Sequence, residues 1–296
     1  MASPPYTAES LFDVRDLVVV VTGGGGGLGR IMAHSLAANG AKAIYLLDIN
    51  SEGLAAAKHS SPAPDLIHTV ICDVTDKESL AAAAGRVRGD MGYCDVVFAN
   101  AGVLKANTGQ TMEGLTSSTP ITTLQEKLWA PTMDEMVQTL TVNVAGVYFT
   151  AVAFLDLLHQ GNQRAVVPQK SQVIVTSSVA GFSRVASVGF AYHASKAGAT
   201  LVYKSLATIL APFKIRVNAV VPGFFPTDMA RGLLGGDGDP RCEGAVPATF
   251  SPLERAGTEE EMAGAVNYLV SRSAAYVNGN ALIIDGGYLA GTPSTY

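Results

Sequence analysis

Tyr192 and Lys196 are the residues whose types and spacing most directly predict chemistry. They lie at the ends of Tyr192-His193-Ala194-Ser195-Lys196, and residues at this spacing share one face of a helix. A free phenol has a pKa of about 10 and keeps its proton at neutral pH. A lysine ammonium held nearby favours the phenolate. The pair therefore predicts a tyrosine that gives and takes a proton at a carbonyl or an alcohol, as in hydride chemistry.

A glycine-rich turn near the N-terminus predicts a nucleotide site. The β-branched run Leu17–Val21 is typical of a buried strand, and the alanine-rich segment Arg30–Asn39 is typical of a helix that ends at Gly40. Glycines at such a turn let the backbone approach a pyrophosphate, which the amide groups of the helix N-terminus then bind. A flexible linker is the weaker interpretation, because linkers do not join a buried strand to a helix.

Asp48 ends the next expected strand, Ala43–Asp48. A carboxylate there accepts hydrogen bonds from ribose hydroxyls and repels a 2′-phosphate. Ile49 and Asn50 carry no positive charge, and the glycine run holds no Arg or Lys. The sequence therefore predicts NAD as the cofactor, with NADP less favoured. The alternative is that Asp48 only caps a helix that begins near Ser51.

Further short motifs follow in order along the chain. They are Thr22-Gly23-x-x-x-Gly27-x-Gly29, Asp73-Val74, Asn100-Ala101-Gly102, Asn143 within Thr141–Gly146, Ser178 before Val179-Ala180-Gly181, and Pro222-Gly223. Together with Tyr192 and Lys196 they resemble a classical short-chain dehydrogenase/reductase from about Leu17 to Gly287. The resemblance implies the α/β class, with a Rossmann-like doubly wound parallel sheet in a single domain over residues 1–296.

The resemblance also implies the members of two sites. The expected catalytic residues are Asn143, Ser178, Tyr192 and Lys196. The expected cofactor-binding residues are Thr22, Gly23, Gly27, Leu28, Gly29, Asp48, Asp73, Val74, Asn100, Ala101, Gly102, Tyr192, Lys196, Pro222, Gly223 and Thr227.

Each catalytic residue takes a role by resemblance. Tyr192 exchanges a proton with the substrate oxygen while a hydride passes between the carbinol carbon and the nicotinamide. Ser178 holds that oxygen, and Lys196 lowers the phenol pKa and holds the nicotinamide ribose. Asn143 is expected to hold a water that links Lys196 to solvent, and Thr227 to hold the carboxamide.

The spacing between the serine and the tyrosine departs from the family pattern. Tyr192 lies one residue farther from Ser178 than is usual, which a one-residue insertion between Phe182 and Ala191 explains. Ser177 is the competing serine, but Ser178 holds the position before Val-Ala-Gly. His193, next to the tyrosine, points about 100 degrees away on a helix and is expected to lie behind the site or at the surface.

The segment 103–133 is well over ten residues longer than is typical of the family. Its Thr, Ser, Gly and Pro content predicts an extended loop, ordered or mobile, rather than a new domain. Trp129 sits near its end. Trp129 is expected either to anchor the returning loop by packing or to belong to a wall or lid of the substrate pocket.

A variable substrate loop is expected at about 223–250. Apolar side chains in and near it predict a hydrophobic pocket, although they would serve equally to pack the loop on itself. The expected pocket residues are Phe182, Phe190, Phe224, Phe225 and Met229.

The expected function is that of an NAD(H)-dependent alcohol dehydrogenase or ketoreductase acting on a hydrophobic secondary alcohol or its ketone. An NADPH-dependent 3-oxoacyl or ketone reductase is the main alternative, and Asp48 argues against it. A non-catalytic dinucleotide-binding sensor or scaffold is disfavoured, because Ser178, Tyr192 and Lys196 are all present.

Composition limits the partners. Lys and Arg number 20 against 25 Asp and Glu, without a basic cluster, so neither nucleic acid nor a membrane surface is expected. The three cysteines and the histidines show no metal-ligand spacing, so no metal and no disulfide are expected. No apolar run is long enough for a membrane span, and no signal peptide is evident, so the cytoplasm is the expected location. By resemblance, helices beginning near Asp134 and Ala191 build a homodimer or homotetramer.

Overall fold

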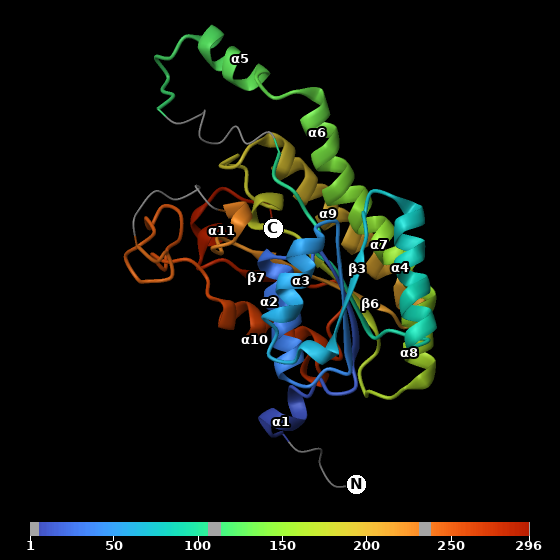
Figure 1. Ribbon diagram of the computed structural model, residues 1–296. Coiled ribbons are helices and arrows are strands. Elements are labelled where there is room, and N and C mark those ends of the chain that lie inside the picture. Colours follow the sequence, from blue (N-terminus) through green and yellow to red (C-terminus); the bar gives the residue numbers. More distant parts are fainter. Residues whose placement is uncertain (1–5, 106–113, 231–237, 296) are drawn as a thin grey trace.

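One parallel sheet of seven strands organises the computed structural model, which describes residues 6–105, 114–230 and 238–295 (Figure 1). The strand order is β3-β2-β1-β4-β5-β6-β7. The chain builds outward from β1 to one edge and then returns to build outward from β4 to the other, which makes the sheet doubly wound. The strands are β1 Val18–Thr22, β2 Ala43–Asp48, β3 Ile67–Ile71, β4 Val96–Ala99, β5 Gln172–Thr176, β6 Arg216–Pro222 and β7 Ala281–Ile284.

The apolar runs form strands because both faces of the sheet are covered. Every residue of β1 is buried. Val18 and Val20 join one core cluster, and Val19 and Val21 join the other. A strand buried on both faces needs no polar alternation, which is why the sequence shows a continuous β-branched run.

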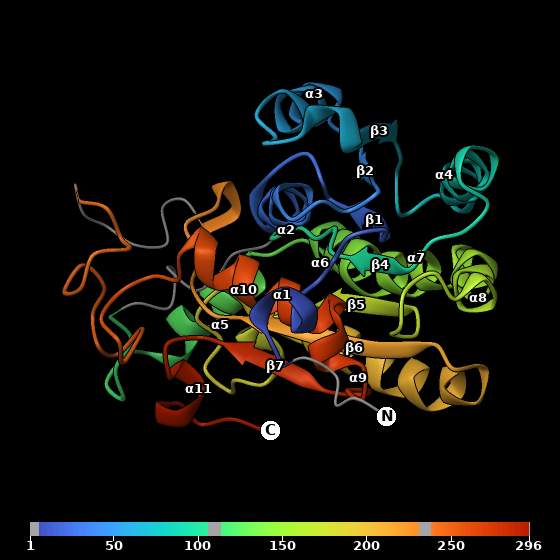
Figure 2. The same ribbon diagram turned by 90° about the horizontal axis from the view of Figure 1, so that it is seen from below.

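Helices form a layer on each face (Figure 2). The first core cluster includes residues of α4, α7, α8 and α9, and the second includes residues of α2, α3 and α10. The predicted Rossmann-like single domain is confirmed. The helices are α1 Ala8–Leu11, α2 Gly27–Ala38, α3 Ser51–His59, α4 Lys77–Asp90, α5 Ile121–Trp129, α6 Met133–Leu140, α7 Val147–Ala153, α8 Leu155–Arg164, α9 Phe190–Leu210, α10 Glu259–Val270 and α11 Tyr288–Gly291.

The long segment at 103–133 contains a helix that stands away from the body of the protein (Figure 1). This helix, α5, has no buried residue, and Trp129 at its end is 83% exposed. The expectation that Trp129 anchors the segment by packing is therefore wrong. Residues 106–113 of the predicted loop lie outside the described residues.

α6, a π-helical turn at Thr141–Gly146 and α7 form one continuous helix from Met133 to Ala153. Within the described ranges it is the one helix long and apolar enough to cross a membrane, with a mean hydropathy of 1.3 and about a third of its apolar stretch buried. It packs against α9 and α4. A core helix of a soluble protein passes the same test, so the expected lack of a membrane span stays a prediction.

Asp95 is a buried charge at the base of the sheet, before β4. Its side chain is 4% exposed, and its Oδ2 accepts a hydrogen bond of 2.8 Å from the Val18 amide. Burial raises the pKa of Asp95 to about 6, against the hydrogen bond and the more distant charges of Lys42 and Arg164, which lower it. The folded protein thus holds this proton at pH values where the unfolded chain has released it.

We expect the folded protein to lose stability as the pH rises and Asp95 ionises. The stability that depends on protonated Asp95 is fully present below pH 4 and is lost by about pH 6, a change of about 3 kcal/mol for a pKa raised from 3.8 to about 6. Asp95→Asn keeps an acceptor for Val18 and removes the ionisation. Urea unfolding between pH 4 and 7 should show the free energy of unfolding of the wild type falling relative to this variant. Asp73→Asn, at an exposed site, is the control, and equal slopes in all three proteins would contradict the explanation.

Candidate active site

A cavity of about 410 Å³ lies at the carboxyl ends of the central strands, where parallel α/β sheets bind their ligands. Among the described residues its walls include both a glycine turn and the Tyr192–Lys196 pair. The expected cofactor residues that line it are Gly23, Gly27, Leu28, Asp48, Asn100, Ala101, Gly102, Tyr192, Lys196, Pro222, Gly223 and Thr227.

The glycine turn exposes the N-terminus of α2 to the cavity. Gly26 precedes α2 and gives it no side-chain cap, so the amides of the first turn face the cavity wall without a side-chain acceptor. Gly29 lies where the turn folds back on itself. A Cβ at Gly29 would lie 2.2 Å from the Gly23 carbonyl oxygen. Only glycine fits there, and the turn presents backbone where a phosphate would bind.

Thr22 and Asn100 hold this turn against the neighbouring strands. Thr22 Oγ1 donates to the Phe98 carbonyl at 3.1 Å and accepts from the amides of Asn100 and Ala101 at 3.0 and 3.1 Å. Asn100 Nδ2 donates to the Thr22 carbonyl at 2.9 Å, and its Oδ1 accepts from Thr176 Oγ1 at 2.9 Å. The ends of β1, β4 and β5 are thereby bonded to one another.

Asp48 lies at the cavity wall rather than on a helix terminus. Its Oδ2 accepts from the Gly25 amide at 3.0 Å, and its Oδ1 accepts from the Asn50 amide at 3.0 Å. Asn50 is the residue that caps α3, accepting from the Gly53 amide at 3.0 Å. The alternative that Asp48 itself caps this helix is therefore wrong.

Four of the expected cofactor residues do not line the cavity: Thr22, Gly29, Asp73 and Val74. The first two shape the turn from behind, as described above. Asp73 is exposed, and its Oδ1 accepts from the Thr75 amide and hydroxyl at 2.8 and 2.7 Å. Val74 is buried against Gly146, where an added Cβ would lie 2.8 Å from Val74 Cγ2.

Ser178 and Tyr192 meet at the other end of the cavity. The Ser178 hydroxyl hydrogen-bonds the Tyr192 hydroxyl and lowers its pKa, but burial is the larger effect and raises the pKa to about 12. Ser177 faces the opposite way, with Oγ 2.7 Å from Thr200 Oγ1. The geometry therefore brings Ser178, not Ser177, to the tyrosine. The raised pKa differs from the expectation that Lys196 favours the phenolate. Without a bound nucleotide, burial keeps Tyr192 protonated at neutral pH.

Lys196 lies beneath the tyrosine on the same helix face. Its Nζ is 5.6 Å from the centre of the Tyr192 ring and donates to the Thr176 carbonyl at 2.9 Å. Burial lowers the pKa of Lys196 to about 8, so most of it still carries a charge at pH 7. Gly102 lies close to this ammonium and to Asn143, since a Cβ there would lie 3.4 Å from Nζ and 3.2 Å from Asn143 Oδ1.

Asn143 lies in the π-helical turn and is fully buried. Its Oδ1 accepts from the Val103 amide at 2.8 Å, and its Nδ2 donates to the Val103 carbonyl and to Ser195 Oγ, both at 2.9 Å. Ser195 Oγ in turn donates to the Tyr192 carbonyl at 2.8 Å. The side chain of Asn143 therefore joins the long segment to the catalytic helix.

The substrate side of the cavity agrees with the sequence in part. Phe224, Phe225 and Met229 line it as predicted, although Phe225 is 5% exposed and packs with the second core cluster. Phe182 does not, because it is buried in the core beside the sheet, and Phe190 does not, because it is exposed on α9. Nearness in sequence to Tyr192 does not fix the direction of a side chain.

Sequence reasoning missed several residues of this wall: Leu104, Ser187, Val188, Phe250 and Tyr288. Leu104 is the one described residue beyond Val103 in the 103–133 segment that lines the cavity, so Trp129 is not part of a wall or lid. Tyr288 follows Asp285-Gly286-Gly287 directly, and that position was a usable signal. His193 is buried, with Nδ1 2.9 Å from the Gly189 carbonyl, and does not line the cavity.

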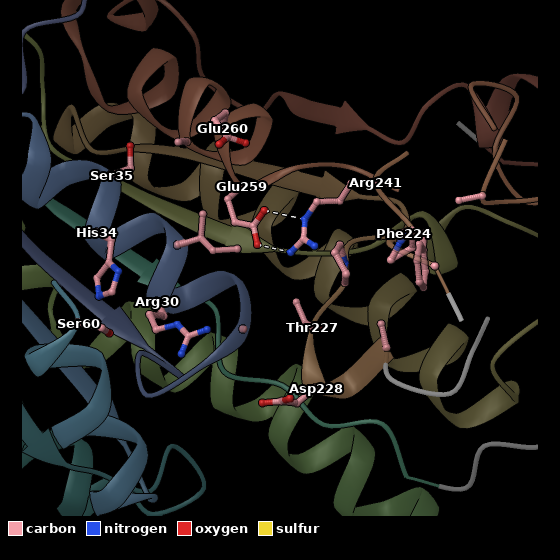
Figure 3. A pocket seen from close by; sticks show the side chains of 18 residues that line it. Arg30, His34, Ser35, Ser60, Phe224, Thr227, Asp228, Arg241, Glu259 and Glu260 are labelled. Atoms are coloured by element: carbon pink, nitrogen blue, oxygen red, sulfur yellow. Dashed lines mark hydrogen bonds and ion pairs between the residues drawn. The ribbon is translucent and has the colours of Figure 1, made fainter. Parts of the chain in front are cut away.

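A second, larger cavity of about 1000 Å³ lies between α2, α10 and the segment after β6 (Figure 3). Arg241 and Glu259 both line this cavity and form an ion pair, with Arg241 Nε donating to Glu259 Oε2 at 2.9 Å. Ser178, Tyr192 and Lys196 are absent from its walls. Size alone therefore does not locate the chemistry, and the smaller cavity is the candidate active site.

Known proteins are similar to this chain in both sequence and fold. A family model described as enoyl-(acyl carrier protein) reductase matches residues 24–289. The short-chain dehydrogenase/reductase VdtF of Byssochlamys spectabilis is 38% identical over 313 residues, which cover 100% of each chain. The chain belongs to the short-chain dehydrogenase/reductase family.

Two further relatives of this short-chain dehydrogenase/reductase indicate the reaction class. Levodione reductase of Leifsonia aquatica is 31% identical, with 93% of this chain and 95% of that protein covered. The solved structure of Pseudomonas aeruginosa RhlG with NADP in its active site superposes with a TM-score of 0.76 at 25% identity, covering 94% and 98% of the two chains. The chain is therefore an oxidoreductase that acts on ketones or alcohols.

We expect Tyr192→Phe to abolish turnover and to leave nucleotide binding intact. Loss of a proton donor typically lowers kcat by about a hundredfold to ten-thousandfold, and the phenyl ring still fills the site. Steady-state kinetics with a ketone that the wild type reduces, and a fluorescence titration with NADH, would measure the two effects. Tyr203→Phe is a matched control on the same helix, because its buried hydroxyl has no hydrogen-bond partner. A Tyr192→Phe variant with wild-type kcat would exclude the assignment.

Proposed function

We propose that this short-chain dehydrogenase/reductase is NAD(H)-dependent and interconverts a hydrophobic secondary alcohol and its ketone, with Tyr192 as general acid and base. The observation that carries the proposal is the convergence of Ser178, Tyr192 and Lys196 on one cavity, whose far end holds Asp48. Phe224 and Met229 supply apolar surface to the same cavity wall. The site thus combines a proton donor, an apolar substrate wall and a nucleotide cradle.

The described residues fit a nicotinamide dinucleotide. Gly23 and Gly27 line the cavity at the uncapped start of α2, which suits a pyrophosphate. Asp48 has acceptor capacity left for ribose hydroxyls beyond its two backbone bonds. When bound, the nicotinamide supplies or accepts the hydride. Thr227, whose side chain lies beside Gly27, would hold the carboxamide end.

The chain's own residues carry the proton. Tyr192 is protonated in the free protein and therefore stands ready to donate to a ketone oxygen held by Ser178. Lys196 places a positive charge behind the ring, which stabilises the phenolate that forms after donation. Oxidation of an alcohol runs through the same atoms in reverse, with Tyr192 accepting the hydroxyl proton.

An NADPH-dependent ketone or 3-oxoacyl reductase is the second candidate. It is favoured by the likeness to RhlG, whose solved structure contains NADP. Against it, Lys196 is the one cationic side chain among the described residues of the cavity wall, and it lies at the catalytic end. A 2′-phosphate next to the Asp48 carboxylate would lack a cationic partner there. A sensor or scaffold without turnover would not need the Ser178–Tyr192–Lys196 arrangement.

Asp48→Asn should weaken the preference for NADH over NADPH. Removing one negative charge close to a 2′-phosphate is worth about 1 to 2 kcal/mol in a partly solvated site, or about a tenfold gain in NADPH affinity. Thermal-shift and fluorescence titrations with both nucleotides would report the ratio of dissociation constants without a known substrate. Asp65→Asn, at an exposed site outside the cavity wall, is the control. A wild type that prefers NADPH would contradict the role of Asp48.

A homo-oligomer is the second part of the proposal. Two neighbouring helical elements, α9 and the helix Met133–Ala153, expose apolar side chains although they pack against each other. Eight exposed apolar side chains on two adjoining helical elements indicate an interaction site. Its members are Met133, Val137, Leu140, Tyr148, Val152, Phe190, Leu201 and Ile209. A second copy of the chain, packed helix against helix around a twofold axis, would cover them.

Leu201→Glu should therefore lower the association state. Leu201 is 68% exposed on α9, so a charge there costs little in the monomer and is buried in the oligomer. Sedimentation velocity of the wild type and the variant would show the shift towards the monomer. Tyr276→Glu, fully exposed on another surface, should leave the mass unchanged. A wild type that sediments as a monomer would refute the oligomer.

A further inference from the structure

Tyr288 places a second phenol in the active-site cavity, in addition to Tyr192. It is the first residue of α11, and it lines the same cavity as Ser178. The proposed proton transfer involves Ser178, Tyr192 and Lys196 and assigns no role to Tyr288. A polar group on an otherwise aromatic wall usually fixes the orientation of a ligand.

The backbone around Tyr288 is held on both sides. Asp285 Oδ1 and Oδ2 accept from the amides of Gly287 and Leu289, each at 2.8 Å. Leu289 is buried in the core. The tyrosine therefore does not depend on a mobile loop for its position.

The Tyr288 hydroxyl is also held, by a residue of the segment that follows Ser178. It lies 3.4 Å from Ser183 Oγ. The chain's last turn fixes that segment, since the Arg184 amide donates to the Pro293 carbonyl at 2.8 Å and the Thr295 amide donates to the Phe182 carbonyl at 2.9 Å. The two ends of the Tyr288–Ser183 contact thus sit on segments that are bonded to each other.

The hydrogen-bond directions at this contact leave an acceptor free. Ser183 Oγ donates its one proton to the Val185 carbonyl at 3.3 Å and accepts from the Val185 amide at 3.0 Å. When the Ser183 proton points to Val185, the Tyr288 hydroxyl is the donor to Ser183 Oγ. Its own oxygen then keeps its lone pairs, and Tyr288 is a residue of the cavity wall. A donor on the ligand is the group that would satisfy them.

The rest of this wall includes two aromatic side chains from separate segments. Phe224 follows β6, and Phe250 comes from the segment before α10. That segment is joined to the Tyr288 region by a hydrogen bond of 3.2 Å from the Leu253 amide to the Gly286 carbonyl. Aromatic side chains that converge from separate segments favour ring systems, which they contact by stacking or edge to face.

We propose that Tyr288 is a specificity-determining residue that accepts a hydrogen bond from a substrate hydroxyl, so that the substrate class is a ring-containing ketone that also carries a hydroxyl group. This inference rests on the proposed function, because it names the ligand of the same site. The ketone oxygen binds Ser178 and Tyr192, and the substrate hydroxyl binds Tyr288. Two polar contacts at separate points of a flat ligand fix its rotation within the apolar wall.

The test measures binding without turnover. 1-Tetralone and a panel of its monohydroxylated derivatives are titrated by calorimetry into the protein saturated with oxidised nucleotide, a pair that cannot transfer a hydride. One net hydrogen bond is worth about 0.5 to 1.5 kcal/mol, so the wild type should bind at least one hydroxylated ketone about fivefold more tightly than 1-tetralone. Tyr288→Phe should remove this preference and leave the dissociation constant of 1-tetralone unchanged. Tyr276→Phe, at a fully exposed tyrosine, should keep it.

The other outcomes overturn the inference. A Tyr288→Phe variant that keeps the preference shows that Tyr288 does not read the hydroxyl. Equal loss of affinity for all the ketones shows a structural role, and a wild type without preference or without binding shows that the class is wrong. Turnover assays separate the two proposals. A hydroxyl preference with no reduction of any ketone by NADH or NADPH contradicts the proposed function alone, whereas reduction without a preference contradicts this inference alone.

Discussion

The hydrogen-bonded seam across the ends of β1, β4 and β5 is the interaction on which both halves of the site depend. Thr22 bonds to the backbone after β4, Asn100 bonds to β1 and to Thr176, and Lys196 Nζ donates to the Thr176 carbonyl. The seam thus connects the glycine turn with the ammonium that supports Tyr192. Because these polar atoms are paired and buried or partly buried, displacement of any one of them leaves another unsatisfied, which is costly. The relative placement of nucleotide cradle and catalytic pair follows from this network.

Burial shifts the two titrating groups of the catalytic pair in opposite directions. It raises the pKa of Tyr192 to about 12 and lowers that of Lys196 to about 8, since it disfavours whichever form carries charge. The phenol is therefore neutral and the lysine still mostly charged at pH 7. In this state Tyr192 is prepared to donate a proton. A positive charge bound near the phenol would lower the pKa of Tyr192 and favour the phenolate.

The sequence predicted the features that backbone geometry dictates. The valine run of β1, the glycine turn and the order of the motifs indicated a doubly wound sheet, because a strand buried on both faces and a close backbone approach each restrict the residue type. Side-chain direction was less accessible. Phe182 and Phe190 flank the turn before α9, yet one packs into the core and the other faces outward. Trp129 shows the same limit, since the length of the 103–133 segment identified an insertion but indicated no packing partner for its apolar residues. Tyr288 was overlooked although it follows Asp285-Gly286-Gly287 directly, because only the tertiary fold brings it beside Ser183.

The attachment of the 103–133 segment has an evolutionary consequence. One root of the segment is Val103, bonded through both its amide and its carbonyl to Asn143. The other root is α6, which runs directly into the π-helical turn that carries Asn143. Both ends of the segment are therefore connected to the helix that carries Asn143. The length and sequence of the segment between these ends can change during evolution while Tyr192 and Lys196 keep their places. The insertion offers the protein a surface that can diversify independently of its chemistry.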